Sequence, residues 1–191
     1  MSCVLGTNCG FVTVAPVDDP AGGSSMVVDS RASALFDTSP ATAVRVTEIG
    51  WWLADATEAA DFEVGIYTDA GNSEPEILLA GSSGPVAKGT AGGVWKVVTG
   101  LNITISPETA YWIGLQLDNT ATQTNTDREY SGGADAYLDG QTALPADWGT
   151  STGTGNDLRA YYAVWDTGGG GAVAPTGTFF GPFGGPFRGV I

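Results

Sequence analysis

The chain has 191 residues, of which 42% are apolar and 10% aromatic, so it can bury the core of one domain and is too apolar for wholesale disorder. Its 21 acidic and 7 basic residues give a formal net charge of −14. The scattered Lys and Arg argue against nucleic acid and anionic membranes as partners, because both require clusters of positive charge.

The first nine residues contain both cysteines, Cys3 and Cys9. A disulfide that closes so short a loop adds little stability, and no further metal ligands lie nearby. We therefore interpret residues 1–9 as a flexible segment with two free thiols. No basic region or continuous apolar run follows Met1, so no signal peptide is expected. No stretch approaches the roughly 18 apolar residues of a membrane span.

Residues 10–166 read as one domain of short β-strands separated by turn residues, without sustained helical periodicity. The expected strands are residues 11–14, 25–28, 34–36, 44–53, 62–67, 76–80, 94–99, 102–105, 111–117, 135–138 and 158–165. With no helix to cover a sheet face, this number of strands predicts sheet packed on sheet. The expected fold is an all-β, jelly-roll-like antiparallel β-sandwich.

Two strand patterns predict which side chains enter the core. Val44 and Val46 share one parity, whereas Ile49, Trp51 and Leu53 continue at the opposite parity. A bulge near residues 47–48 would turn all five toward one core. Residues 62–67 alternate cleanly, so their even-numbered side chains are expected to face inward.

Three segments resemble a widespread type of jelly-roll domain, found in phage fibre, baseplate and capsid-decoration proteins and in bacterial surface proteins. The segments are Phe62-Glu-Val-Gly-Ile-Tyr-Thr-Asp-Ala-Gly, Pro75-Glu-Ile-Leu-Leu, and Ile103-Thr-Ile-Ser-Pro-Glu-Thr-Ala-Tyr-Trp-Ile-Gly, with Trp95 before the last. The resemblance covers about residues 40–166. It implies a non-catalytic sandwich that is often attached to a larger assembly, and it identifies no binding residue.

The sequence contains no histidine, which removes Ser-His-Asp and Cys-His catalysis and the commonest zinc sites. A pair of carboxylates could hydrolyse glycosides, but no pair stands out among 21 acids. We therefore expect no enzymatic activity and no cofactor. Calcium is a weaker alternative, because carboxylates and an amide gather in the loop-rich part of the chain. These residues are Asp118, Asn119, Asp127, Asp135, Asp139, Asp147 and Asp157.

Three aromatic residues are candidates for ligand binding. Trp148 lies in a loop, and with Tyr130 and Tyr137 it could form a flat platform on which sugars stack. The alternative is that Trp148 is a loop aromatic that packs on the end of the sandwich.

The C-terminal residues 167–191 carry the strongest functional signal. Four consecutive glycines, 168–171, read as a linker. The apolar and basic residues expected to bind a partner follow, and they are Phe179, Phe180, Phe183, Phe187 and Arg188. Their spacing among Gly and Pro fits neither a helix nor a strand, and each exposed Phe is unfavourable by about 1.5–3 kcal/mol. We predict that another chain orders this anchoring tail.

These observations favour a non-catalytic structural virion component, such as a capsid-decoration, head or fibre-type protein, docked through its tail. Only 15% of the residues are charged, which is more typical of virion and extracellular β-proteins than of cytosolic enzymes. The expected partners are other virion proteins or further copies of the chain. The alternative is a carbohydrate-binding module that recognises a cell-surface glycan.

Overall fold

The computed structural model describes residues 2–20, 23–24, 30–71, 73–118 and 126–168. These residues form strands and loops, with no helix among them. The strands are β1 (Gly10–Val12), β2 (Gly23–Ser24), β3 (Arg31–Thr38), β4 (Arg45–Leu53), β5 (Asp61–Asp69), β6 (Pro75–Leu78), β7 (Val86–Ala87), β8 (Val94–Thr104), β9 (Ala110–Asp118), β10 (Asp127–Glu129), β11 (Asp135–Asp139), β12 (Gly153–Gly155), β13 (Leu158–Arg159) and β14 (Tyr161–Asp166). The strand predicted at 25–28 lies outside the described residues.

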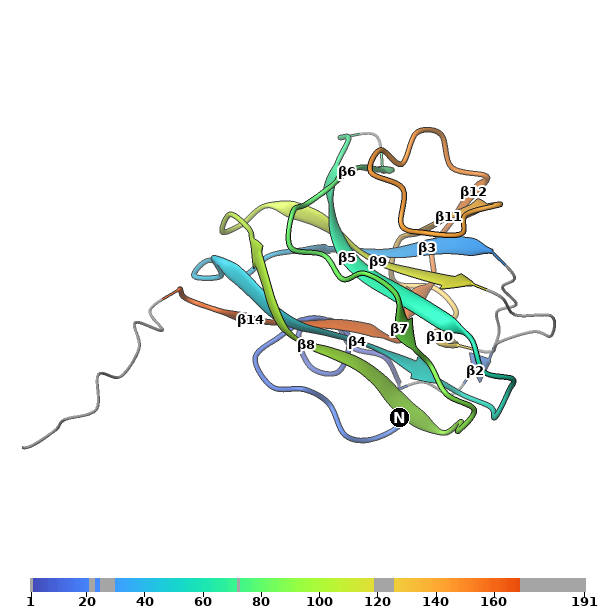
Figure 1. Cartoon of the computed structure of the whole chain (residues 1–191). Helices are drawn as coiled ribbons and strands as arrows, with labels where there is room; N and C mark the ends of the chain where they lie inside the picture. The colour runs from blue at the N-terminus through green and yellow to red at the C-terminus, as the bar shows by residue number, and fades with distance from the viewer. Residues whose placement is uncertain (1, 21–22, 25–29, 72, 119–125, 169–191) are drawn as a thin grey trace, which may run out of the picture.

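Two sheets face each other (Figure 1). The smaller has the order β1-β14-β4-β8, and the larger has the order β12-β11-β3-β9-β5-β6, with β7 also paired to β5. Neighbouring strands are antiparallel except for β1 and β14, which are parallel. A short third sheet has the order β13-β10-β2. The predicted all-β sandwich is confirmed, because alternating strands can bury their apolar faces only against a second sheet.

The inner core contains the apolar residues that the strand patterns predict. Phe62, Val64 and Ile66 of β5 are buried there, as the alternation of residues 62–67 requires. Trp51 of β4 meets the Phe62 ring edge to face, with the centroids 5.6 Å apart. The two sheets therefore interdigitate through aromatic as well as aliphatic side chains.

The predicted bulge on β4 is also confirmed. Neighbouring residues of β14, Val164 and Trp165, pair with Glu48 and Val46 of β4, so Thr47 is the extra residue; four of the five expected side chains enter the inner core. The fifth, Val44, lies just before β4 and is only half-buried. The extra residue lets residues of opposite parity share one face, which a regular strand cannot do.

The two strands predicted on either side of Gly100 form one strand, β8. Gly100 has a φ of +73°, and β4 pairs with β8 both before it, at Thr99, and after it, at Ile103. Glycine adopts this left-handed conformation without steric strain, so the chain bulges there instead of turning back.

A second apolar layer covers the outer face of the larger sheet. Tyr67 of β5 and Trp112 of β9 point away from the inner core, yet each is 0% exposed. Residues 140–152, the orange loop in Figure 1, cover them: the Tyr67 hydroxyl donates to the Pro145 carbonyl at 2.9 Å. The Leu144 amide donates to the Glu63 carboxylate at 2.7 Å. Because this loop covers the outer face of the larger sheet, β5 and β9 are buried on both faces.

The prediction of two free thiols is wrong, because Cys3 and Cys9 form a disulfide. Both residues are buried in the inner core, and the Cys3 sulfur contacts the Arg159 carbonyl at 3.5 Å. The Phe11 amide then donates to the Asp37 carboxylate at 2.8 Å, which fastens β1 to β3. The segment before β1 thus packs against the sandwich. Loop length alone does not reveal this, because the burial of Cys3 and Cys9 depends on the core that later strands form.

A buried ion pair joins the third sheet to the larger sheet. The guanidinium of Arg159 on β13 pairs with the carboxylate of Asp135 on β11, and their side chains are 3% and 4% exposed. The second carboxylate oxygen of Asp135 accepts the Asp157 amide at 3.1 Å. Because both charges are removed from water, each depends on the other.

Candidate functional site

The predicted partner-binding residues of the tail, Phe179, Phe180, Phe183, Phe187 and Arg188, lie outside the described residues. The structure does describe the chain up to residue 168, where the tail begins. β14 ends at Asp166, whose carboxylate pairs with the guanidinium of Arg45 and accepts the Gly168 amide at 2.8 Å. The hydrogen bond from Arg45 holds the pKa of Asp166 below its usual range. The last residues before the tail are thus fixed to β4.

Trp148 is 2% exposed and belongs to the second apolar layer. Its ring meets Tyr67 edge to face, with the centroids 5.0 Å apart, and its indole N–H donates to the Ser151 hydroxyl at 3.0 Å. The covered ring offers no face to a sugar. Trp148 is therefore a packing residue, which matches the alternative interpretation of a loop aromatic.

Tyr137 and Tyr130 lie elsewhere. Ala136 is in the second layer with Trp148, so the next residue, Tyr137, points to the opposite face of the larger sheet. The Arg31 guanidinium carbon lies 4.2 Å from the Tyr137 ring centroid. Tyr130 is 57% exposed and contacts the Arg128 guanidinium. The predicted platform of three rings is not formed, since alternation along β11 separates Tyr137 from Trp148.

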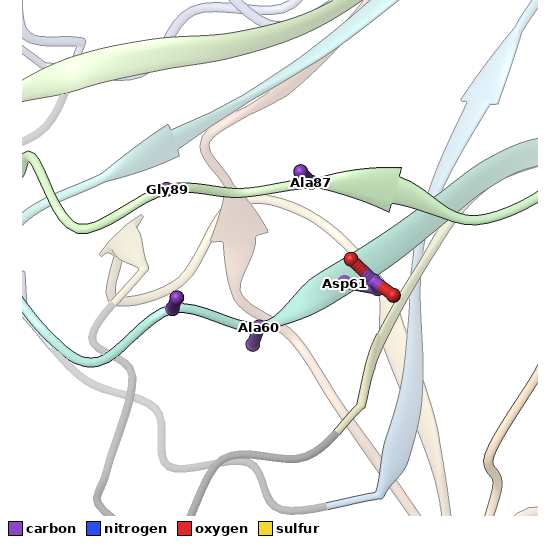
Figure 2. Close-up of a pocket in the computed structure, with 5 residues that line it drawn as sticks. Ala60, Asp61, Ala87 and Gly89 are labelled. Carbon is purple, nitrogen blue, oxygen red and sulfur yellow. The ribbon is translucent and has the colours of Figure 1, made fainter.

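A pocket of about 320 Å³ lies where β5 and β7 meet. Its lining residues are Ala59, Ala60, Asp61, Ala87 and Gly89. Figure 2 shows Asp61 at the start of β5, across from Ala87 and Gly89, and these two strands pair at Asp61 and Ala87. Four of the five lining residues are Ala or Gly, and all but Ala60 are exposed, so the pocket is a shallow, open depression with a mostly apolar lining and one charged side chain, Asp61.

Lys88 holds the two loops of the pocket together. Its ammonium donates to the Thr57 hydroxyl at 2.6 Å, the Glu58 carbonyl at 2.7 Å and the Gly89 carbonyl at 3.2 Å, and the residue is 2% exposed. Burial lowers the pKa of Lys88. Nearby, a Cβ on Gly92 would lie 2.1 Å from the backbone of residue 55, so only glycine fits there. The walls of the pocket are therefore fixed by internal contacts.

No sequence pattern marks Lys88 for this role, because it stands alone among small and neutral residues. The pocket was missed for the same reason. Alanines and glycines at residues 59–60 and 87–89 carry no chemical signal until β5 and β7 pair.

Acidic side chains gather at the same end of the sandwich. They are Asp19, Asp55, Glu58, Asp61, Asp118 and Asp127. Asp61 and Asp118 stand directly opposite each other on β5 and β9. Burial, a hydrogen bond with Asp19 and the charge of Asp55 raise the pKa of Asp127 to about 7. Lys88 and Lys96 also lie at this end, but the six acids outnumber them, so the end remains negative and favours positively charged groups.

Arginines hold three of the residues considered for calcium. Asp135, Asp139 and Asp157 pair with different arginines, namely Arg159, Arg31 and Arg128. Asn119 lies outside the described residues. Within the described ranges, no group of three or more His, Cys, Asp and Glu side chains could hold a metal ion.

Comparisons with protein-family models, with curated proteins and with solved structures found no match to this chain. In the part of the chain that the structure describes, no helix has the length and apolar character needed to cross a membrane.

Proposed function

We propose that this protein is a non-catalytic structural subunit of a virion or a related surface particle, docked to its neighbours through residues 167–191. One observation carries the proposal: an apolar tail with four Phe residues follows a sandwich whose core is already filled by its own side chains.

The physical reason is that the interior formed by the described residues is already occupied by their own side chains. Residues 3–165 supply the inner core, and a loop covers the second layer. The four rings would be unfavourable in water by about 1.5–3 kcal/mol each. A tail that becomes ordered on a partner buries them there, while the glycine linker lets the sandwich project outward.

Three further observations support a location outside the reducing cytosol. The disulfide between Cys3 and Cys9 is typical of proteins that work in oxidising surroundings. The low content of charged residues, 15%, and the resemblance to jelly-roll domains of virion proteins agree with this assignment. A separate observation concerns the non-catalytic role: the buried carboxylate of Asp135 pairs with Arg159, so this charge stabilises the fold.

The experiment replaces the chain, in the organism or virus that encodes it, with a full-length variant carrying F179A, F180A, F183A and F187A. We expect the number of copies per purified particle to fall at least about tenfold while the thermal unfolding of the isolated protein is unchanged. Incorporation equal to that of the unaltered chain contradicts the proposal.

Carbohydrate binding has less support. Trp148 is buried, and one face of Tyr137 is taken by Arg31, which leaves Tyr130 as the most exposed of the three predicted residues. A glycan array with the full chain and its Y130A variant tests this alternative, which requires binding that the substitution abolishes.

A further inference from the structure

We propose that the pocket at Asp61 receives Phe187 and Arg188 from the tail of a second copy of this chain, so that copies associate head to tail. The inference rests on the proposed function and names the partner and the acceptor site. It starts from three properties of the pocket: its size, its charge and its position relative to the tail.

The size of the pocket suits one aromatic side chain. Its volume of about 320 Å³ is at the lower limit of typical ligand pockets, which span about 300–1,000 Å³. The alanine and glycine lining leaves the space open and gives an apolar surface against which a phenyl ring can pack. Because Lys88 fixes the surrounding loops, the pocket is formed before any partner arrives.

The charge of the pocket suits a neighbouring cation. Arg188 is the only charged side chain in residues 169–191, and it directly follows Phe187. A phenyl ring in the apolar part of the pocket would therefore bring a guanidinium to its rim. The Asp61 carboxylate stands there, with Asp118 on the next strand. A guanidinium and a carboxylate form a charge-assisted hydrogen bond, and the other acids at this end attract the same cation.

The tail and the pocket lie at opposite ends of the sandwich. β4 and β14 are antiparallel, so Asp166, where the tail begins, is next to Arg45 at the start of β4. The pocket residues Ala59, Ala60 and Asp61 come after the other end of β4, at Leu53. In Figure 1 the red end of β14 is at the left, whereas β7 is to the right. A donor at one end and an acceptor at the other are the elements of a heterologous contact, which propagates into a ring or a filament.

The reach of the tail permits this contact. Phe187 follows Gly168 by 19 residues. A chain of that length spans up to about 60 Å when extended, which exceeds the roughly 30 Å length of β4. The tail is therefore long enough to enter a neighbouring copy, and also long enough to reach the pocket of its own copy, which would leave the full chain monomeric.

Sedimentation analysis of the full chain tests the inference, from micromolar concentrations to about 1 mM. We expect reversible self-association that weakens at least about tenfold in F187A, in R188D and in D61R. A87Y, which fills the pocket from an exposed strand position, should weaken it similarly. E108R is the matched control, because it makes the same charge change at an exposed turn and should leave association within about threefold.

Mixing two variants that no longer self-associate gives the sharpest result. D61R keeps its tail and F187A keeps its pocket, so one interface forms between them and the mixture should yield a one-to-one heterodimer. Circular dichroism melts show that each variant is folded. A full chain that stays monomeric, a mixture without heterodimers, or D61R and A87Y variants that associate normally would each overturn the inference.

These outcomes are separate from a failure of the proposed function. If pocket variants enter particles normally while the four Phe substitutions prevent entry, the tail docks on a different protein and only this inference fails. If the Phe substitutions have no effect on entry, the proposed function itself fails.

Discussion

Replacing Trp148 with alanine tests the interpretation that this residue holds the second apolar layer in place. Trp148 is 2% exposed, packs on Tyr67, and donates its indole N–H to Ser151. The Trp148 amide also donates to the Glu76 carbonyl at 2.8 Å, a bond that the substitution leaves in place. The change therefore removes side-chain packing without removing the anchor of the loop.

The expected loss follows from these contacts. Replacing a buried Trp or Phe with Ala typically destabilises a protein by about 3–5 kcal/mol. That range already includes an edge-to-face contact such as that with Tyr67, worth about 0.5–1.5 kcal/mol, and a hydrogen bond such as that of the indole, worth about 1 kcal/mol. Because residues 140–152 form a surface loop that can relax, we expect about 3–4 kcal/mol in total. In a protein of this size that lowers the melting temperature by roughly 10 °C.

Urea unfolding followed by far-ultraviolet circular dichroism measures the loss without relying on the fluorescence of the residue removed. W148F keeps most of the packing and should lose only about 1 kcal/mol. Y130A, at a site that is 57% exposed, should lose less than about 1 kcal/mol. A W148A protein whose free energy of unfolding stays within 1 kcal/mol of the unaltered chain refutes the packing role.

The remaining predictions concern buried charge and the disulfide. The native pKa of Asp127 is raised to about 7, so its protonated form stabilises the protein at low pH, and this contribution is lost as pH rises from about 4 to 8. D127N should flatten that part of the pH dependence of urea unfolding. An identical pH dependence in both proteins argues against the raised pKa. R159M leaves the buried carboxylate of Asp135 unpaired and should destabilise the protein by about 3–5 kcal/mol. R31M, at the more exposed pair with Asp139, should cost about 1 kcal/mol or less. Equal losses in thermal unfolding contradict the role of burial. Reducing the Cys3–Cys9 disulfide should lower the free energy of unfolding by about 2 kcal/mol. Thiol titration without reductant should find no free thiol, and two free thiols would contradict the pairing.

The sequence was sufficient for the inner core. Alternation at Phe62, Val64 and Ile66 and the change of parity after Val46 both report which side chains share a face. Such patterns are local, since each depends only on neighbours along one strand. For that reason the sandwich and the bulge on β4 could be predicted without knowing how the strands are ordered.

The sequence was not sufficient where distant segments meet. Alternation placed Tyr67 on the outer face of its strand, but it could not reveal that residues 140–152 cover that face and bury Trp148 with it. The burial of Cys9 likewise depends on a core made by later strands. The pocket at Asp61 exists only because β5 pairs with β7.

The most direct measurement of the central claim asks where the tail rings lie. Full chains carrying a photo-crosslinking phenylalanine analogue at position 183 are prepared with light and heavy nitrogen, mixed, and irradiated at high concentration or after entry into particles. The account predicts crosslinks between tail peptides and a different polypeptide, either another copy or a particle protein. Crosslinks confined to the same chain, with no mixed-isotope or heterologous product, would contradict it.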